Sequence, residues 1–128
     1  MPDTSILIVD DDPDSLDIVR TFLESKGYRV TTAQDGKTGL AKLEEARPAL
    51  VLLDVMMPGM DGWEVARVIK NHPQFGDTRV VMLTARSGFT DKQEGLRAGA
   101  DDYIVKPIRL DELATRVEKN LEARTNAP

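Results

Sequence analysis

Four short runs of apolar residues, each followed by a polar side chain, stand out along the chain. They occupy residues 6–9, 50–53, 80–83 and 103–105, and none alternates between apolar and polar positions. Strands that are buried on both faces have this pattern, which is typical of parallel sheets. Segment 29–33 mixes apolar residues with threonines and an arginine, so we expect it to form a strand at the sheet edge.

Segments with helical spacing separate these strands. Between 13 and 26, apolar residues recur every three or four positions, and Gly27 follows where a helix commonly ends. Asp12, which precedes a proline, is interpreted as the N-cap of this helix. Val68 and Leu110 belong to the apolar stripes of later helices, so both are expected to face the core. The strands are expected at about 5–10, 29–33, 50–54, 79–84 and 102–105, and the helices at about 13–26, 37–46, 63–71, 90–98 and 110–123.

Five strands that alternate with helices predict one α/β domain, because crossovers between parallel strands are right-handed and place helices on both faces of the sheet. We expect a flavodoxin-like, doubly wound (βα)5 fold with a five-stranded parallel sheet in the order 2-1-3-4-5. The domain is assigned to residues 1–124, with 125–128 as a disordered tail.

Composition narrows the range of partners. The net charge of -5 offers no basic face for the phosphate groups of nucleic acid, so direct nucleic-acid binding is not expected. The chain has no cysteine, which excludes disulfides and thiolate metal sites. No apolar stretch approaches the roughly 20 residues that span a bilayer, and the first residues lack the pattern of a signal peptide. We therefore expect a cytoplasmic domain that does not enter a membrane.

Chemically capable side chains follow the apolar runs. Asp10 and Asp11 follow the first run, whereas Asp54, Thr84 and Lys106 follow the other three. In an open parallel sheet these positions meet at the edge where ligands bind. Carboxylates at close range repel each other unless a cation joins them, and Mg²⁺ prefers such oxygen ligands. A carboxylate beside Mg²⁺, together with a hydroxyl and an ammonium, is suited to phosphoryl transfer.

The same residues carry a family resemblance that covers essentially the whole chain. Their order, with the loop Met57–Gly62 and the segment Gly99–Tyr103, closely resembles the receiver domain of bacterial two-component response regulators, including the chemotaxis type. The resemblance implies that Asp54 accepts a phosphoryl group from the phosphohistidine of a sensor histidine kinase or phosphotransfer protein. It also implies a Mg²⁺ ion, replaceable by Mn²⁺, held by Asp54, Asp11, Asp10 through water, and the backbone carbonyl of Met56.

The resemblance also implies a switch. Thr84 and Lys106 would contact the phosphoryl group, and Tyr103 would turn inward behind Thr84. The Lys106–Pro107 peptide would be cis. This movement would change the surface formed by the helix at 90–98, the strand at 102–105 and the last helix, which would contact a downstream protein, a fused output domain or a second copy of the chain.

The lifetime of the phosphoryl group is the subject of one hypothesis. Met56 and Arg86 occupy the two positions that tune this lifetime in the family, and we expect them to shield the group from water. The resemblance also implies that the chain is a phosphoacceptor switch rather than an enzyme. It would catalyse its own phosphotransfer and a slow autodephosphorylation.

Two other functions compete with this interpretation. Asp10-Asp11-Asp12 contains the Asp-x-Asp pattern of haloacid-dehalogenase-type phosphatases, but Asp54 fits better as the nucleophile, and the hydroxyl residue expected after that pattern is missing. A degenerate receiver that serves only as an interaction module is the second alternative. Such a domain usually lacks an acidic-pair member, the acceptor or the lysine, and all are present here.

Overall fold

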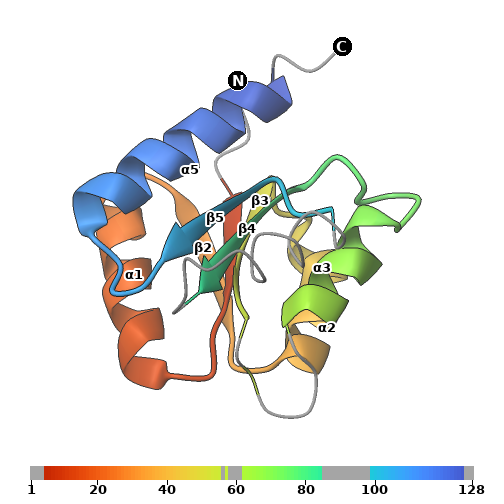
Figure 1. Cartoon of the computed structure of the whole chain (residues 1–128), viewed down its shortest axis with the longest axis horizontal. Coiled ribbons are helices and arrows are strands. Elements are labelled where there is room, and N and C mark those ends of the chain that lie inside the picture. Colours follow the sequence, from red (N-terminus) through yellow and green to blue (C-terminus); the bar gives the residue numbers. More distant parts are fainter. Residues whose placement is uncertain (1–4, 56, 58–61, 85–98, 126–128) are drawn as a thin grey trace.

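A five-stranded parallel sheet in the order β2-β1-β3-β4-β5 forms the centre of the molecule (Figure 1). The computed structural model describes residues 5–55, 57, 62–84 and 99–125. The elements are β1 (Ser5–Val9), α1 (Pro13–Ser25), β2 (Arg29–Ala33), α2 (Gly36–Ala46), β3 (Leu50–Asp54), α3 (Gly62–Lys70), β4 (Arg79–Thr84), β5 (Asp102–Val105) and α5 (Leu110–Thr125). The predicted strand order and the edge position of β2 are confirmed.

Most element boundaries agree with the sequence pattern to within one or two residues. The helix expected at 90–98 lies outside the described residues. β1 ends at Val9, one residue before its expected end, and α5 continues to Thr125, beyond the expected domain boundary at residue 124. The remaining tail residues, 126–128, also lie outside the described part. Among the helices of the described chain, none is long and apolar enough to span a bilayer.

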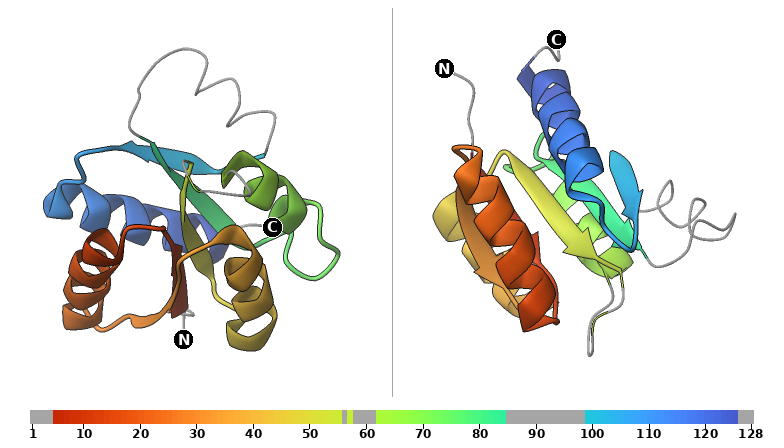
Figure 2. Two further views of the ribbon diagram at one scale, coloured as in Figure 1. Left: turned by 90° about the horizontal axis from the view of Figure 1, so that it is seen from below. Right: turned by 90° about the vertical axis from the view of Figure 1, so that its left-hand side faces the viewer.

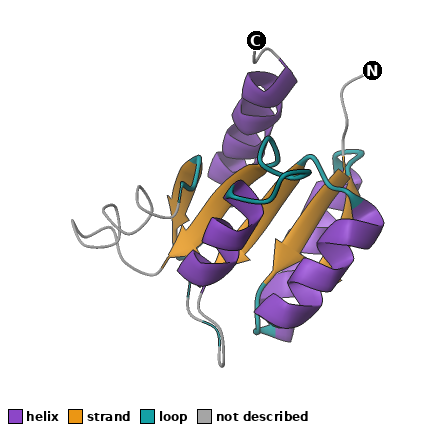
Figure 3. Ribbon diagram, turned by 90° about the vertical axis from the view of Figure 1, so that its right-hand side faces the viewer, coloured by secondary structure: helices purple, strands orange, loops and turns teal. Residues whose placement is uncertain are grey.

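The helices form one layer on each face of the sheet. Figure 2 shows α1 and α5 on one face and α2 and α3 on the other, and in Figure 3 the strand arrows point toward a common edge. Two apolar clusters fill the spaces between sheet and helices. Alternate residues of the same strand belong to different clusters: Leu52 faces α1 and α5, whereas Val51 and Leu53 face α2 and α3. This double burial explains why the strands contain unmixed apolar runs.

Local capping interactions mark both ends of α1 near the residues that the sequence predicts. The Asp12 side chain accepts a hydrogen bond from the Asp14 backbone N–H and so caps α1. At the other end Gly27 has φ +94°, and its N–H donates to Glu24 while that of Tyr28 donates to Leu23. Glycine adopts this left-handed conformation without steric cost.

Two apolar side chains that were expected in the core are exposed. Val68 is 45% exposed on α3, because Val65, Ala66 and Ile69 already fill the face that packs against the sheet. Leu110 is 37% exposed, since it starts α5 beyond the carboxyl edge of the sheet. The predictions for both side chains were wrong.

Candidate functional site

The carboxyl edge of the sheet carries the candidate site. Backbone hydrogen bonds extend three strand pairings past the last apolar residues: Asp10 N–H donates to Ala33, Val55 N–H to Leu83, and Lys106 N–H to Thr84. These bonds fix the backbone where the functional side chains begin. The site therefore stands on the rigid sheet.

Two buried carboxylates, Asp10 and Asp54, and the partly exposed Lys106 form the centre of the site. Asp10 is 2% exposed and Asp54 is 4% exposed. The Lys106 ammonium lies 3.5 Å from a carboxylate oxygen of Asp10 and 3.4 Å from one of Asp54. The Lys106 ammonium thus faces both buried carboxylates, and burial strengthens both the attraction to the cation and the repulsion between the anions.

Asp11 adds a third carboxylate at the solvent side. One carboxylate oxygen each from Asp10, Asp11 and Asp54 lie within 4.8 Å of one another, with Asp11 exposed and the other two buried. The charge of one ammonium does not balance three carboxylates. The donors are hard oxygens, and the open side provides room for water, so the residues fit Mg²⁺.

Thr84 and Tyr103 lie on the opposite face of the sheet from this charged centre. Met82 pairs with Tyr103, and Thr84 pairs with Val105. Thr84 therefore lies two residues closer to the carboxyl edge than Tyr103, on the same face of the sheet. Tyr103 is half-buried against the cluster that contains Met82, and Thr84 is buried. The two residues expected to form the switch pair are thus diagonal neighbours on one face.

Other expected site residues differ in how far they can be placed. The Lys106–Pro107 peptide bond is cis. Met56 and Arg86 lie outside the described residues. The predicted carbonyl ligand and the predicted shielding of the phosphoryl group therefore fall outside the described part of the chain.

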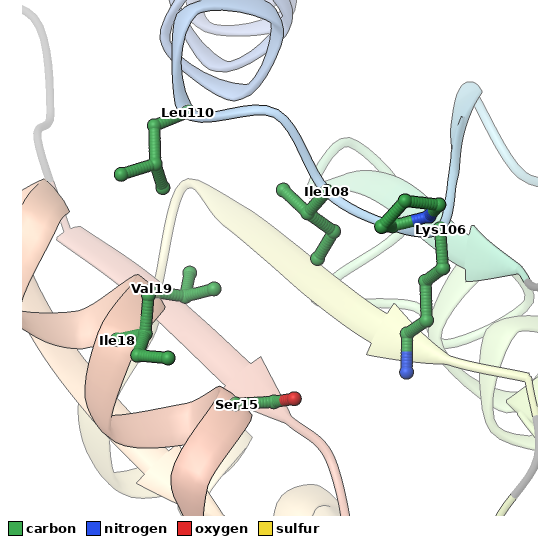
Figure 4. A pocket seen from close by; sticks show the side chains of 7 residues that line it. Ser15, Ile18, Val19, Lys106, Ile108 and Leu110 are labelled. Atoms are coloured by element: carbon green, nitrogen blue, oxygen red, sulfur yellow. The ribbon is translucent and has the colours of Figure 1, made fainter.

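An apolar groove borders the charged centre. It measures about 360 Å³ and separates α1 from the segment between β5 and α5 (Figure 4). Its lining residues are Ser15, Ile18, Val19, Lys106, Pro107, Ile108 and Leu110. Lys106 belongs both to the groove and to the charged centre, so the two are continuous.

A second polar cluster, which sequence reasoning missed, lies at the amino edge of the sheet. Asp101 accepts a hydrogen bond from the Lys70 ammonium at 2.9 Å and forms an ion pair with Arg79 at 3.4 Å. The Asn120 side chain accepts from Arg79 at 3.0 Å and donates to Asp102 at 2.9 Å. This network joins α3, β4, β5 and α5 at the end of the sheet opposite the carboxylates.

One sequence signal points to this amino-edge network. Asn120 falls between Val117 and Leu121 in the apolar stripe of α5, and it is 2% exposed. A polar residue at a buried helical position requires hydrogen-bond partners. The pattern could therefore have identified Asn120 as a buried polar residue, but not its partners.

Comparison with known proteins agrees with the resemblance in the sequence. Residues 6–118 match the family model of the response regulator receiver domain. The DNA-binding response regulator MtrA of Mycolicibacterium smegmatis is 40% identical over 123 residues, which cover 96% of this chain and 53% of that protein. The transcriptional regulatory protein AfsQ1 of Streptomyces coelicolor is 44% identical over 117 residues, covering 88% and 49%, respectively. The chain spans about half the length of the curated relatives it matches.

Solved structures of the same size superpose closely. A CheY-like receiver domain protein from Methanospirillum hungatei has a TM-score of 0.89 at 34% identity and covers 98% of both chains. The chemotaxis protein CheY4 of Vibrio cholerae has a TM-score of 0.87 at 34% identity and covers 91% of this chain and 97% of its own. Neither a phosphatase of the haloacid-dehalogenase type nor a degenerate interaction module finds support in these comparisons. The chain belongs to the response regulator receiver domain family, whose members are phosphorylation-activated signalling switches rather than turnover enzymes.

Proposed function

We propose that Asp54 accepts the phosphoryl group of a phosphohistidine on a histidine kinase or phosphotransfer protein. A carboxylate oxygen of Asp54 attacks phosphorus and forms the new P–O bond. The P–N bond breaks, and its electron pair goes to the imidazole nitrogen. That nitrogen is then free to take a proton from solvent. Aspartyl phosphates are known covalent intermediates, so the step uses established carboxylate chemistry.

The observation that carries this proposal is the position of the Asp54 carboxylate. It is buried at the end of β3, and the Lys106 ammonium lies 3.4 Å away. Phosphoryl transfer depends mainly on positioning and on charge stabilisation. Lys106 would neutralise a phosphoryl oxygen, and the Thr84 hydroxyl would donate a hydrogen bond to another.

Asp10, Asp11 and Asp54 would hold Mg²⁺ or Mn²⁺, with Met56 as the proposed backbone ligand. Bound there, the ion neutralises negative charge that otherwise repels an incoming phosphoryl group. The support is the set of three carboxylates with oxygens within 4.8 Å of one another. The burial of Asp10 and Asp54 and the close approach of three negative charges make a divalent ion favourable on charge grounds.

Tyr103 would report phosphorylation to the output surface. When Thr84 moves toward the phosphoryl group, space opens on the same face of the sheet, and Tyr103 would turn into it. Tyr103 lies on β5, so the movement would change the surface formed by residues 90–98, β5 and α5. This surface would control a downstream protein, a fused output domain or pairing with a second copy.

The apolar groove beside Lys106 is where we place the phosphodonor. Ile18 is 59% exposed at the groove, and Lys106 connects the groove to Asp54. Ile18→Asp should slow transfer from a phosphorylated phosphotransfer protein while leaving labelling by acetyl phosphate unchanged. Val68→Asp, which alters an equally apolar side chain on α3, is the matched control. An equal effect of both variants would argue against this placement.

Met56 and Arg86 are proposed to slow loss of the phosphoryl group by excluding water. Met56→Asn and Arg86→Ala should each shorten the lifetime of the aspartyl phosphate. The test is the rate at which purified phosphorylated protein returns to its original mass. Unchanged rates in both variants would refute the shielding role.

Intact mass spectrometry tests the acceptor itself. Wild-type protein incubated with acetyl phosphate and Mg²⁺ should gain one phosphoryl group, and Asp54→Ala should gain none. Asp77→Asn removes an exposed carboxylate at the opposite end of the sheet and should label normally. Labelling of Asp54→Ala at the wild-type rate, or failure of the wild type to label, would overturn the assignment.

A further inference from the structure

Gly62, the first residue of α3, approaches the backbone of Asp54 more closely than any side chain permits. A Cβ atom added to Gly62 would lie 2.2 Å from the backbone oxygen of Asp54 and 2.9 Å from its carbonyl carbon. It would also lie 2.9 Å from the Cα of Val55. All three contacts involve backbone atoms, so no side-chain rotation can relieve them.

The contact closes the loop that follows Asp54. The Gly62 N–H donates to the Val55 backbone oxygen at 3.0 Å, while the Val55 N–H donates to Leu83 at 3.0 Å. The peptide after Asp54 is thus held by β4 from one side and by the start of α3 from the other. Moving it away from Gly62 would disturb its bond to β4.

The start of α3 has little freedom to retreat. Trp63 is 8% exposed and belongs to the same apolar cluster as Val55 and Met57. Val65 and Ala66 are fully buried in that cluster. Because the interior is close-packed, displacement of α3 would disturb this whole layer. A side chain at residue 62 would therefore displace the backbone that carries the Asp54 carboxylate.

We propose that Gly62 is a positioning residue for the Asp54 carboxylate, because the absence of a side chain sets the distance between α3 and the end of β3. The proposal rests on the function assigned to Asp54. To reach even the shortest separation that a Cβ atom tolerates, the gap must widen from 2.2 Å to at least 3.0 Å. Reactive groups need placement within about 0.5 Å, so this shift is large enough to impair both metal binding and attack on phosphorus.

The experiment compares Gly62→Ala with Gly39→Ala. Gly39 is also a buried glycine near a helix start, but its added Cβ would meet side-chain atoms of Val9, the nearest at 2.9 Å. Both variants are first shown to be folded by circular dichroism. Mg²⁺ affinity is then measured by calorimetry, and the rate of labelling by acetyl phosphate is measured at saturating Mg²⁺.

For Gly62→Ala we expect roughly a 10- to 100-fold slower labelling rate, as for a misplacement of about 1 Å, together with weaker Mg²⁺ binding. Gly39→Ala should keep both quantities within about twofold of wild type even if it lowers stability, because it moves a side chain rather than the site backbone. The contrast separates a role at the site from a general packing defect.

Folded Gly62→Ala protein with wild-type Mg²⁺ affinity and labelling rate would overturn the proposal. If the variant is unfolded, both measurements are repeated in trimethylamine N-oxide, which favours the folded state. Failure to fold even there would also overturn it, since the glycine would then serve the fold. A wild-type chain that never labels would overturn the proposed function instead, and the Mg²⁺ titration would still decide the role of Gly62.

Discussion

Lys106 reaches across the end of β4 to place its ammonium 3.4 Å from a carboxylate oxygen of Asp54 on β3. The ammonium also lies 3.5 Å from a carboxylate oxygen of Asp10, the residue that directly follows β1. One side chain from the edge of the sheet therefore offsets the charge of two buried carboxylates on inner strands.

Lys106→Met should destabilise the metal-free protein by about 1–2 kcal/mol, less than for a fully buried pair because Lys106 is 28% exposed. Its removal leaves two buried carboxylates facing each other. Urea denaturation with EDTA measures the loss, and saturating Mg²⁺ should recover part of it. Lys119→Met on the exposed side of α5 is the control and should change stability by less than about 0.5 kcal/mol. Equal losses in the two variants would contradict the charge argument.

Asp10→Asn should have opposite effects with and without Mg²⁺. The amide oxygen can still accept the hydrogen bond from the Asp12 N–H, while one of three clustered negative charges disappears. We expect a gain of about 0.5–1 kcal/mol in EDTA from reduced repulsion and at least a tenfold loss of Mg²⁺ affinity. Urea denaturation and calorimetry measure the two quantities. Unchanged Mg²⁺ affinity would show that Asp10 does not contribute to a metal site.

Asn120→Ala should cost about 2–3 kcal/mol, because it removes a buried amide and leaves Arg79 and Asp102 without that partner. Asn71→Ala is a close control. Both amides donate to the backbone oxygen four residues earlier in a helix, but Asn71 is exposed. Thermal or urea unfolding should separate the two variants by more than about 1 kcal/mol, and similar values would contradict a stabilising role for the amino-edge network.

Asp35 gives the fold a predictable dependence on acid. Its carboxylate caps α2 by accepting from the Thr38 N–H at 2.7 Å and the Thr38 hydroxyl at 3.1 Å, and these bonds hold the pKa of Asp35 below its ordinary value of 3.8. A lowered pKa in the folded state means that the contribution is present above the ordinary pKa and is lost as the pH falls through the folded value.

Asp35→Asn keeps a capping oxygen but cannot ionise. The stability advantage of wild type over this variant should therefore be constant near neutral pH and should shrink below about pH 4. Asp35→Ala should be less stable than wild type at neutral pH. Urea denaturation across the acid range provides the measurement, and a difference that grows with acid would contradict the assignment.

Much of the architecture follows from the sequence because burial on both faces leaves an unmistakable pattern. The runs that became β1, β3 and β4 contain only apolar residues before the polar side chains that follow them, so strands buried on both faces could be predicted. Their order followed from the doubly wound fold that alternating strands and helices indicate. The position of Val68 was wrong because helical periodicity identifies an apolar stripe but not how far the sheet covers it.

Other features depend on distances between backbones that no sequence period encodes. Lys70 and Asp101 form a hydrogen bond although 31 residues separate them in the sequence. Gly62 has no room for a side chain only because α3 starts against the backbone at the end of β3. The charged centre was easier to anticipate. Parallel strands end at one edge, so Asp10, Asp54 and Lys106, which follow three of the apolar runs, had to meet there.

β5 is short and is held at both ends. Asp102 at its start accepts hydrogen bonds from Arg116 and Asn120 of α5, and Lys106 directly beyond its last residue faces Asp54. Four residues of strand span about 13 Å. β5 therefore joins the carboxylate site at one edge of the sheet to the hydrogen bonds with α5 at the other edge, so a displacement of Lys106 along this short strand would reach α5 through Asp102.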